Sequence, residues 1–210
     1  MLKNRKFLLI LTTVVVLLPM IVGLCLWSVL PDSLATHFDE TGTADGWSSK
    51  AFAVFALPLF IFACHWLCIG CTLADPKAQN ISEKIFSLIA WICPAVSLFS
   101  GTAIYSAALG ISLNVASAGN LLMAILFIVL GNYLPKCKPN YTVGIKLPWT
   151  LHDEENWRRT HRFAGYLWMI GGVILLATAF LPNVWILLPV LLILAFAPML
   201  YSYILYVRSK

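Results

Sequence analysis

Charged residues are scarce in this chain of 210 residues. They make up 11% of the sequence, against 60% hydrophobic residues, whereas soluble proteins average about 25% charged residues. None of the nine Asp and Glu residues falls inside a long apolar run. The composition therefore excludes an ordinary soluble domain, and the lack of an intramembrane carboxylate weakens the case for a transporter coupled to protons or sodium.

Cysteines and catalytic motifs are also in short supply. None of the six cysteines lies in a loop that we predict to face outward, so no disulfide framework is predicted. Cys64, Cys68 and Cys71 have a CxxxCxxC spacing that also occurs in iron–sulfur enzymes, but they fall in an apolar run, where buried cysteines behave as small hydrophobes. There is no G-x-S-x-G nucleophile motif and no set of three or four firm zinc ligands. We therefore predict no enzyme activity, no cofactor and no metal site.

Long apolar runs are what the sequence does contain. A helix needs about 20 mainly apolar residues to cross a hydrocarbon core about 30 Å thick, and lipid cannot satisfy free backbone groups, which favours helices. Six charge-free runs of this length predict an all-α, polytopic membrane bundle in a single domain, 1–210. The predicted transmembrane helices are 7–30, 51–73, 85–109, 115–134, 163–181 and 184–207, with an outer loop at 31–50 and a cytoplasmic loop at 135–162.

The first run is preceded by basic residues, as a secretory signal would be. It is longer than the apolar core of a signal peptide, which has about 7 to 15 residues, and no small-x-small cleavage site closes it. We therefore expect it to remain as a helix.

Basic residues fall almost entirely on one side of the predicted helices. If the N-terminus is cytoplasmic, thirteen of the fourteen Lys and Arg residues lie inside and only Lys50 lies outside. Positive residues favour the cytoplasmic side of a membrane. We therefore predict that both termini are cytoplasmic, that the net charge of +5 reflects topology and not direct nucleic-acid binding, and that the inner loops favour anionic membrane lipids.

The outer loop at 31–50 is acidic and rich in turn-forming residues. Gly42 and the Asp45–Gly46 pair predict turns, and Ser48 or Ser49 would cap the next helix. Two interpretations stay open: a small acidic platform that meets a cationic molecule from outside, or a solvated connector between two helices. The residues that the platform would use are His37, Asp39, Asp45, Trp47 and Lys50.

His65 is the one ionisable residue well inside a predicted helix, apart from cysteines and tyrosines. Ionisable groups inside a membrane are functional candidates. The simpler interpretation is a neutral histidine that is hydrogen-bonded to a neighbouring helix.

A helix is predicted to begin within the polar interval 140–165. Pro148 biases its predecessor away from helical geometry, and Thr150 with Asp153 has the spacing of a capping box, with Thr150 as the capping residue. We expect a short interfacial helix at the inner surface that runs into the fifth span near Phe163.

The charges of this helix have an order that suits it. Acids occupy its first turn and arginines follow, which complements the helix dipole, and Glu154–Arg158 and Glu155–Arg159 have i,i+4 spacing. Trp157 and His161 share a face by the same spacing. Three interpretations stay open: an anchor whose tryptophans and arginines meet lipid headgroups, a surface for a partner, or a catalytic site. The catalytic candidates are His152, Asp153, Glu154 and His161.

Two stretches resemble a known family. Asn-Tyr-Leu-Pro at 132–135, the segment 140–151 and the segment 157–165 resemble the signature of the SdpI family, membrane immunity proteins against the sporulation-delaying-protein toxin of bacteria. The outer loop from 30 to 50 resembles the N-terminal domain of unknown function of the same proteins. Lys146 and Leu147 stand where the family pattern has Arg-Thr. A lysine supplies a point charge at this position and not the bidentate hydrogen bonds of an arginine.

The resemblance implies a non-enzymatic, multi-pass protein of the bacterial cell membrane that confers immunity to a secreted membrane-active peptide toxin. It also implies that a winged-helix repressor can be captured at the cytoplasmic face. The cytoplasmic residues that would bind this partner are Asn140, Tyr141, Gly144, Lys146, Pro148, Trp149, Trp157, Arg158, Arg159 and His161. The alternatives are a small transporter or lipid-handling membrane enzyme that uses His37, His65 or His161, and a regulator that only sequesters a cytoplasmic protein.

Overall fold

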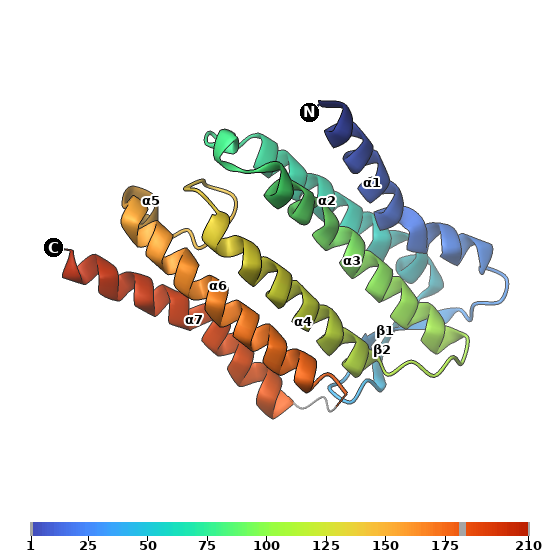
Figure 1. Ribbon diagram of the computed structural model, residues 1–210. Helices are drawn as coiled ribbons and strands as arrows, with labels where there is room; N and C mark the ends of the chain where they lie inside the picture. The colour runs from blue at the N-terminus through green and yellow to red at the C-terminus, as the bar shows by residue number, and fades with distance from the viewer. Residues whose placement is uncertain (1, 181–183, 210) are drawn as a thin grey trace. The chain divides into compact units, whose positions relative to one another are not determined.

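Long helices dominate the computed structural model, which describes residues 2–180 and 184–209 (Figure 1). The long helices are α1 (Leu2–Cys25), α2 (Leu57–Leu73), α3 (Glu83–Ala108), α4 (Val115–Tyr133), α6 (Glu154–Ala177) and α7 (Val184–Arg208). The shorter elements are strands β1 (Ser33–Phe38) and β2 (Ala44–Ser49), a π-helical turn η1 (Phe52–Ala56), 3₁₀ turns η2 (Ala78–Asn80) and η3 (Leu134–Lys136), and helix α5 (Pro148–His152).

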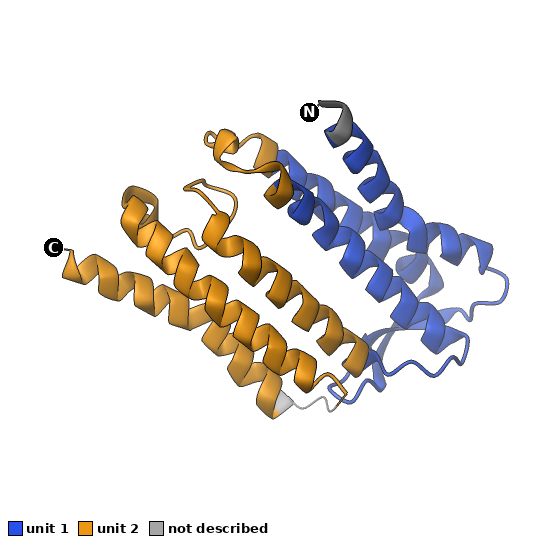
Figure 2. Cartoon of the chain, in the orientation of Figure 1, with its two compact units in different colours: residues 1–71, 86–116 blue, residues 72–85, 117–210 orange. Residues whose placement is uncertain are grey.

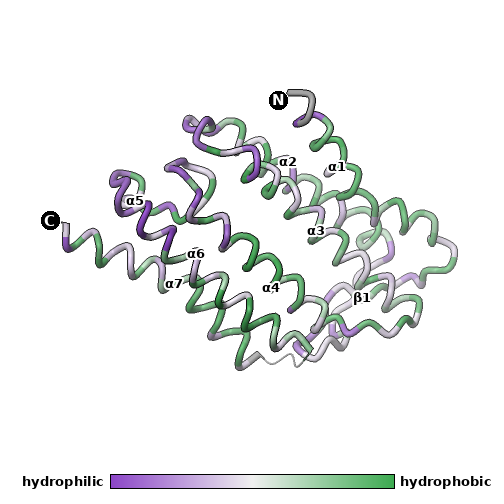
Figure 3. The backbone as a smooth tube through the Cα atoms, in the orientation of Figure 1, coloured by the Kyte–Doolittle hydropathy of each residue, from purple (hydrophilic) through white to green (hydrophobic). Residues whose placement is uncertain are grey.

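Five helical segments among the described residues are long and apolar enough to cross a membrane, and their apolar stretches are visible in Figure 3. They are Arg5–Cys25, Phe52–Leu73, Glu83–Ala108, Val115–Lys136 and Trp185–Arg208. The chain is therefore a helical membrane protein, as predicted. Many large apolar side chains on these helices are exposed in the isolated chain, among them Phe60 and Phe196, as expected for surfaces that face lipid.

The fifth predicted span, 163–181, corresponds to the second half of α6 and ends outside the described residues. It is not one of the five segments, because the helical part of this run is short and the first half of α6 is strongly charged. The expected helix that runs into this span near Phe163 is the first half of α6, which is continuous from Glu154 to Ala177; its interfacial position stays a prediction. A count of six spans with both termini inside stays a prediction.

The outer loop folds as an antiparallel β-hairpin, which the prediction of an all-α fold did not include. Gly42 has a φ of 85° and lies in the turn, so its prediction as a turn residue is confirmed. The predicted turn at Asp45–Gly46 is wrong, because both residues lie inside β2, where Gly46 pairs with His37 beside a register shift. Of the two predicted capping residues, Ser49 accepts a hydrogen bond from the backbone N–H of Phe52 through its hydroxyl oxygen (3.3 Å).

The chain divides into two compact units (Figure 2). The first unit consists of residues 1–71 and 86–116, and the second of residues 72–85 and 117–210. In the first unit, the hairpin is anchored by Leu34, which is buried in a cluster with Val54 and Ile104. Hydroxyl groups of α3 also bind carbonyls of α1: Ser97 donates to Val16 (2.7 Å) and Tyr105 donates to Pro19 (2.8 Å).

The second unit contains α4, α6 and α7. A Cβ added at Gly131 of α4 would lie 2.8 Å from the carbonyl oxygen of Gly165 of α6, so only small residues allow this approach of the two helices. The indole of Trp168 on α6 donates to the carbonyl of Leu194 on α7 (3.0 Å). The connector 72–85 and the loop that precedes α5 lie at the same end of this unit (Figure 2).

Candidate functional site

Asn140 organises the loop between η3 and α5, which we call the signature loop (residues 137–147). Its side chain is 1% exposed. The amide oxygen accepts hydrogen bonds from the backbone N–H groups of Thr142 (2.9 Å) and Val143 (2.6 Å), and the amide nitrogen donates to the carbonyl of Lys138 (2.8 Å). The side chain thus forms the hydrogen bonds that a backbone turn would otherwise make. Its partners are backbone groups of the same loop.

Asp75 holds the same loop from the connector between α2 and α3. One carboxylate oxygen accepts from the N–H of Tyr141 (2.8 Å) and from the hydroxyl of Thr142 (2.6 Å), and the other accepts from the N–H of Lys77 (2.7 Å). Burial alone raises the pKa of Asp75, but these hydrogen bonds outweigh it, so the pKa lies below its ordinary value. Asp75 therefore stays ionised at neutral pH.

The sequence alone predicts no role for Asp75. Two further contacts join the connector to the signature loop: the amide of Asn80 donates to the carbonyl of Pro139 (2.6 Å), and the ammonium of Lys77 lies 5.2 Å from the ring centre of Tyr141. These partners are about 60 residues apart in the chain. The local sequence signal was only a carboxylate in a connector on the side predicted to be basic.

His161 of α6 is fully buried and holds the other end of the signature loop. Its Nε2 accepts from the N–H of Ile145 (2.9 Å), and its Nδ1 lies 2.8 Å from the carbonyl of Trp157. These partners fix a neutral ring with the proton on Nδ1. Burial lowers the pKa of His161 to about 4, although the hydrogen bond to Trp157 acts in the opposite direction.

Gly144 leaves the space that this contact needs. It has a φ of 110°, a conformation that side chains disfavour, and an added Cβ would lie only 2.3 Å from Nε2 of His161. Trp157 completes the packing: its ring stacks on His161 with 4.0 Å between ring centres, as their predicted common face requires, and its indole N–H donates to the carbonyl of Cys137 (2.8 Å).

The predicted capping box is wrong in its assignment. Thr150 lies inside α5, where its hydroxyl accepts from the N–H of Leu147 (2.9 Å). The N-cap of α6 is Asp153, whose carboxylate accepts from the N–H groups of Glu155 (2.9 Å) and Asn156 (3.0 Å). The reason is the break between α5 and α6, which leaves the first amides of α6 in need of an acceptor.

A buried polar group joins α5 and α6 to α7. The indole of Trp149 donates to the hydroxyl of Ser202 (2.8 Å), which in turn donates to the amide oxygen of Asn156 (2.8 Å). The ring of Trp149 also stacks on Tyr206, with 5.6 Å between ring centres. Trp149 is therefore packed against α7 and is not free at the surface.

The ten predicted cytoplasmic residues thus divide into two groups. Asn140, Trp157 and His161 are buried and form the inner framework with Gly144, and Trp149 packs on α7. The residues with exposed side chains are Tyr141, Lys146, Pro148, Arg158 and Arg159. Arg158 pairs with Glu155 (2.7 Å) at i,i+3 spacing, instead of with Glu154 as predicted.

The hairpin brings its predicted residues together at its exposed face. Nδ1 of His37 lies at hydrogen-bond distance (2.5 Å) from the carboxylate of Asp45, with side chains 73% and 46% exposed, and Trp47 is 61% exposed. Asp39 accepts from Thr41 and Thr43 within the turn. Because of these hydrogen bonds, that of the Thr41 side chain above all, the pKa of Asp39 is below its ordinary value.

Lys50 lies at the base of the hairpin. Its ammonium group is 3.3 Å from the carboxylate of Asp32 and 3.3 Å from the carbonyl of Trp27. Most acids of the predicted platform therefore already have partners within the hairpin, which leaves Trp47 as its main feature.

His65 lies in α2 and is 1% exposed, and its Nε2 is 3.3 Å from the hydroxyl of Thr12 on α1. This contact is the one expected of a histidine bonded to a neighbouring helix. Its Nδ1 has no hydrogen-bond partner within residues 2–180 and 184–209. In those residues there is also no group of three or more His, Cys, Asp or Glu side chains that could hold a metal ion.

The site is therefore a buried hydrogen-bonded framework under an exposed, basic surface, and it belongs to a helical, multi-pass membrane protein. Residues 136–202 match the model of the SdpI/YfhL protein family. Residues 14–62 match a domain of unknown function, DUF1648. The chain is thus similar to the SdpI family in both parts that the sequence resemblance indicated.

A curated relative extends this similarity along most of the chain. Immunity protein SdpI of Bacillus subtilis (strain 168) is 22% identical over 192 residues, which cover 90% of this chain and 89% of that protein. No solved structure matches. The similarity to this family and the apolar helices together indicate a multi-pass protein of the bacterial cell membrane.

Proposed function

We propose that the chain is an immunity protein that protects the cell membrane against a secreted, membrane-active peptide toxin. The observation that carries this proposal is the similarity to Immunity protein SdpI, which extends over 192 residues and so takes in both the hairpin and the signature loop. A relative that matched only one of these two parts would support the fold and not the function. The function proposed is binding, and it requires no catalytic group.

The exposed face of the hairpin is the proposed contact surface for the toxin. Asp45 and Trp47 lie two residues apart in β2, and both side chains are exposed. Leu34 of the opposite strand is buried in the core cluster, which anchors the hairpin. An exposed tryptophan near a hydrogen-bonded histidine and aspartate suits an amphipathic peptide, since the indole supplies apolar area and a hydrogen-bond donor.

Protection of a toxin-sensitive host tests the proposal. Cells that express the chain, or an empty vector, are challenged with each purified secreted peptide encoded beside its gene. We expect survival to rise with the wild-type chain, and we expect Trp47→Ala to lose this gain while its amount in the membrane is unchanged. Trp91→Ala is the control, because Trp91 is also exposed (38%) but lies in α3. Unchanged killing by every peptide tested would contradict the function.

A specific feature also favours docking of a cytoplasmic protein. A hollow of about 620 Å³ lies beside the signature loop. It is lined by Pro135, Lys136, Cys137, Lys138, Pro139, Glu154, Glu155, Trp157 and Arg158. Lys136 and Lys138 are exposed, so this part of the rim would attract an acidic protein surface. The partner proposed from the family resemblance is a winged-helix repressor.

Co-sedimentation with lipid nanodiscs tests this docking. Discs with the full chain are mixed with the repressor encoded nearest to its gene, and empty discs are the baseline. We expect retention above the baseline and a marked loss with Lys138→Glu, because one attractive charge becomes repulsive. Lys84→Glu makes the same charge change outside the hollow and should retain the repressor. Equal retention on empty discs would show that the chain does not dock it.

A further inference from the structure

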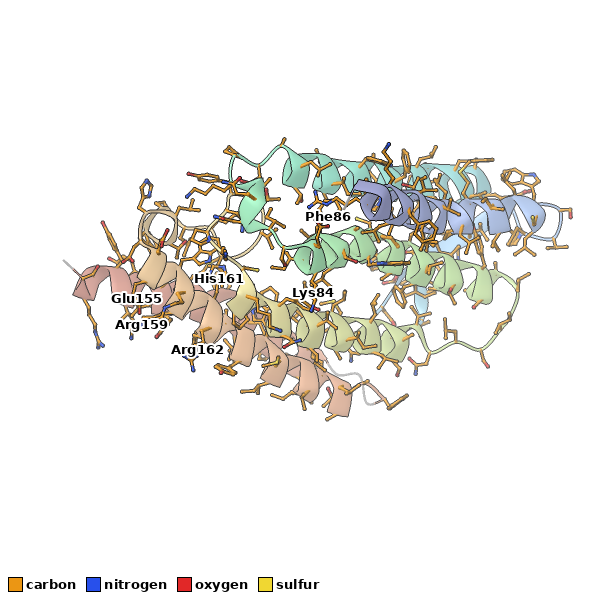
Figure 4. All side chains as sticks on the ribbon, turned by 45° about the horizontal axis from the view of Figure 1, so that its top comes forward. Lys84, Phe86, Glu155, Arg159, His161 and Arg162 are labelled. Atoms are coloured by element: carbon orange, nitrogen blue, oxygen red, sulfur yellow. The ribbon has the colours of Figure 1, made fainter. Side chains whose placement is uncertain are left out.

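A second polar hollow lies between α6 and α7 and shares Glu155 and Arg158 with the hollow beside the signature loop. Its volume is about 350 Å³. Its lining residues are Glu155, Arg158, Arg159, Arg162, Phe163, Tyr166 and Tyr201, of which Tyr201 belongs to α7. Figure 4 shows Glu155, Arg159 and Arg162 one after another along one side of α6, with His161 of the inner framework on the other side. Nothing in the proposed immunity function uses this hollow.

The hollow carries an excess of positive charge. Glu155 binds Arg158 through two hydrogen bonds, of 2.9 Å and 2.7 Å, and so neutralises one of the three arginines. Arg159 and Arg162 are exposed, and neither has an ion-pair partner in the described part of the chain. Two guanidinium groups are therefore free to bind an anion, and their planar donor groups match the geometry of a phosphate.

An apolar stripe continues from the arginines along the same face of α6. Arg162 directly precedes Phe163, where the apolar part of the helix begins. Tyr166, Ile170 and Val173 follow at spacings of four, four and three residues, which keeps them on the face of Arg162. Their side chains are 52%, 59% and 56% exposed. The face therefore changes from cationic, through a phenol, to apolar toward the C-terminal end of α6.

We infer that this face binds an anionic glycerophospholipid. Arg159 and Arg162 bind its phosphate, the phenol groups of Tyr166 and Tyr201 lie beside the glycerol region, and an acyl chain runs along Ile170 and Val173. A free phosphate would use the arginines but not the apolar stripe, and an acidic protein surface would not extend into the hydrocarbon region. Basic pockets between helices at the cytoplasmic side of membranes bind anionic headgroups in this way.

Thermal unfolding of the purified full chain in a neutral detergent tests this inference. Three probes are titrated: dioleoyl phosphatidylglycerol, dioleoyl phosphatidylcholine and inorganic phosphate. We expect only phosphatidylglycerol to raise the Tm at micromolar to millimolar concentration. The double variant Arg159→Gln/Arg162→Gln should need about tenfold more of this lipid for the same rise, since it loses both attractive charges.

Two further variants separate the site from general charge effects. Lys6→Gln/Lys84→Gln removes the same charge outside the hollow and should respond like the wild type. Arg159→Lys/Arg162→Lys keeps the charge and should bind with an intermediate affinity, and it also serves if the glutamine variant does not fold. An equal Tm rise with phosphatidylcholine, an equal rise with phosphate alone, or a wild-type response of the arginine variants would each overturn the inference.

Discussion

Replacement of Gly144 by alanine should destabilise the protein by more than the backbone conformation alone explains. Gly144 has a φ of 110°, and a residue with a Cβ held in the positive-φ region costs about 1–2 kcal/mol. In addition, the new Cβ would lie 2.3 Å from Nε2 of His161, so the ring must move. The hydrogen bond from Ile145 to His161 would then be lost, and its buried groups left unpaired cost about 1–3 kcal/mol. The expected total is about 2–5 kcal/mol.

Gly110 provides a matched control. It also has a positive φ, of 70°, but an added Cβ would meet no atom within 4 Å. Gly110→Ala should therefore show the conformational cost alone, about 1–2 kcal/mol. The free energy of unfolding is measured for both variants in detergent by denaturant titration, with tryptophan fluorescence as the signal.

A third variant links the loss to His161. In a His161→Ala background the new methyl group at Gly144 has no ring to displace, so Gly144→Ala should cost only as much as Gly110→Ala. The reasoning is refuted if Gly144→Ala and Gly110→Ala lose the same free energy in the wild-type background. It is also refuted if the cost at Gly144 does not depend on His161.

Three further predictions concern the same framework, and each is measured by the same unfolding experiment. The pKa of His161 is about 4 in the folded protein, against an ordinary value near 6.5. The contribution of His161 to the free energy of unfolding is therefore complete above about pH 6.5 and falls by up to about 3 kcal/mol as the pH drops toward 4. His161→Phe should remove this pH dependence, and an unchanged pH dependence would contradict the assignment. Asp75→Asn should cost about 1.5–3 kcal/mol, because the three donors at Asp75 meet only one amide oxygen, and Thr142→Val should cost less in that variant than in the wild type. Trp157→Phe should cost about 1–3 kcal/mol, because the buried carbonyl of Cys137 loses its donor; a smaller loss would mean that water replaces the indole.

The helices of this fold could be predicted from the sequence because they depend on local composition. Runs of about 20 apolar residues can only be helices in lipid, and the structure has long helices at the first four runs and the last. The hairpin could not be predicted in this way, since β2 has the sequence ADGWSS and little intrinsic preference for a strand. Burial of Leu34 against other elements stabilises it, and no local pattern reports that contact.

The signature loop shows the same limit for the site. The common face of Trp157 and His161 follows from helix periodicity, and the structure confirms it. The role of Asp75 depends on a contact with Tyr141, 66 residues away, which no spacing rule contains. The resemblance identified the residues of the motif, but only the structure shows that Asn140 and His161 act inside the protein and not at its surface.

Survival of toxin-challenged cells tests the central claim most directly. Cells expressing the wild-type chain, Trp47→Ala or an empty vector receive the same dose of the secreted peptide encoded beside the gene, and the surviving fraction is counted with the membrane level of each protein. Immunity predicts high survival with the wild type, and survival near that of the empty vector with Trp47→Ala at an equal membrane level. If the wild type survives no better than the empty vector, the chain does not confer immunity to that peptide; if this holds for every candidate peptide, the claim is wrong.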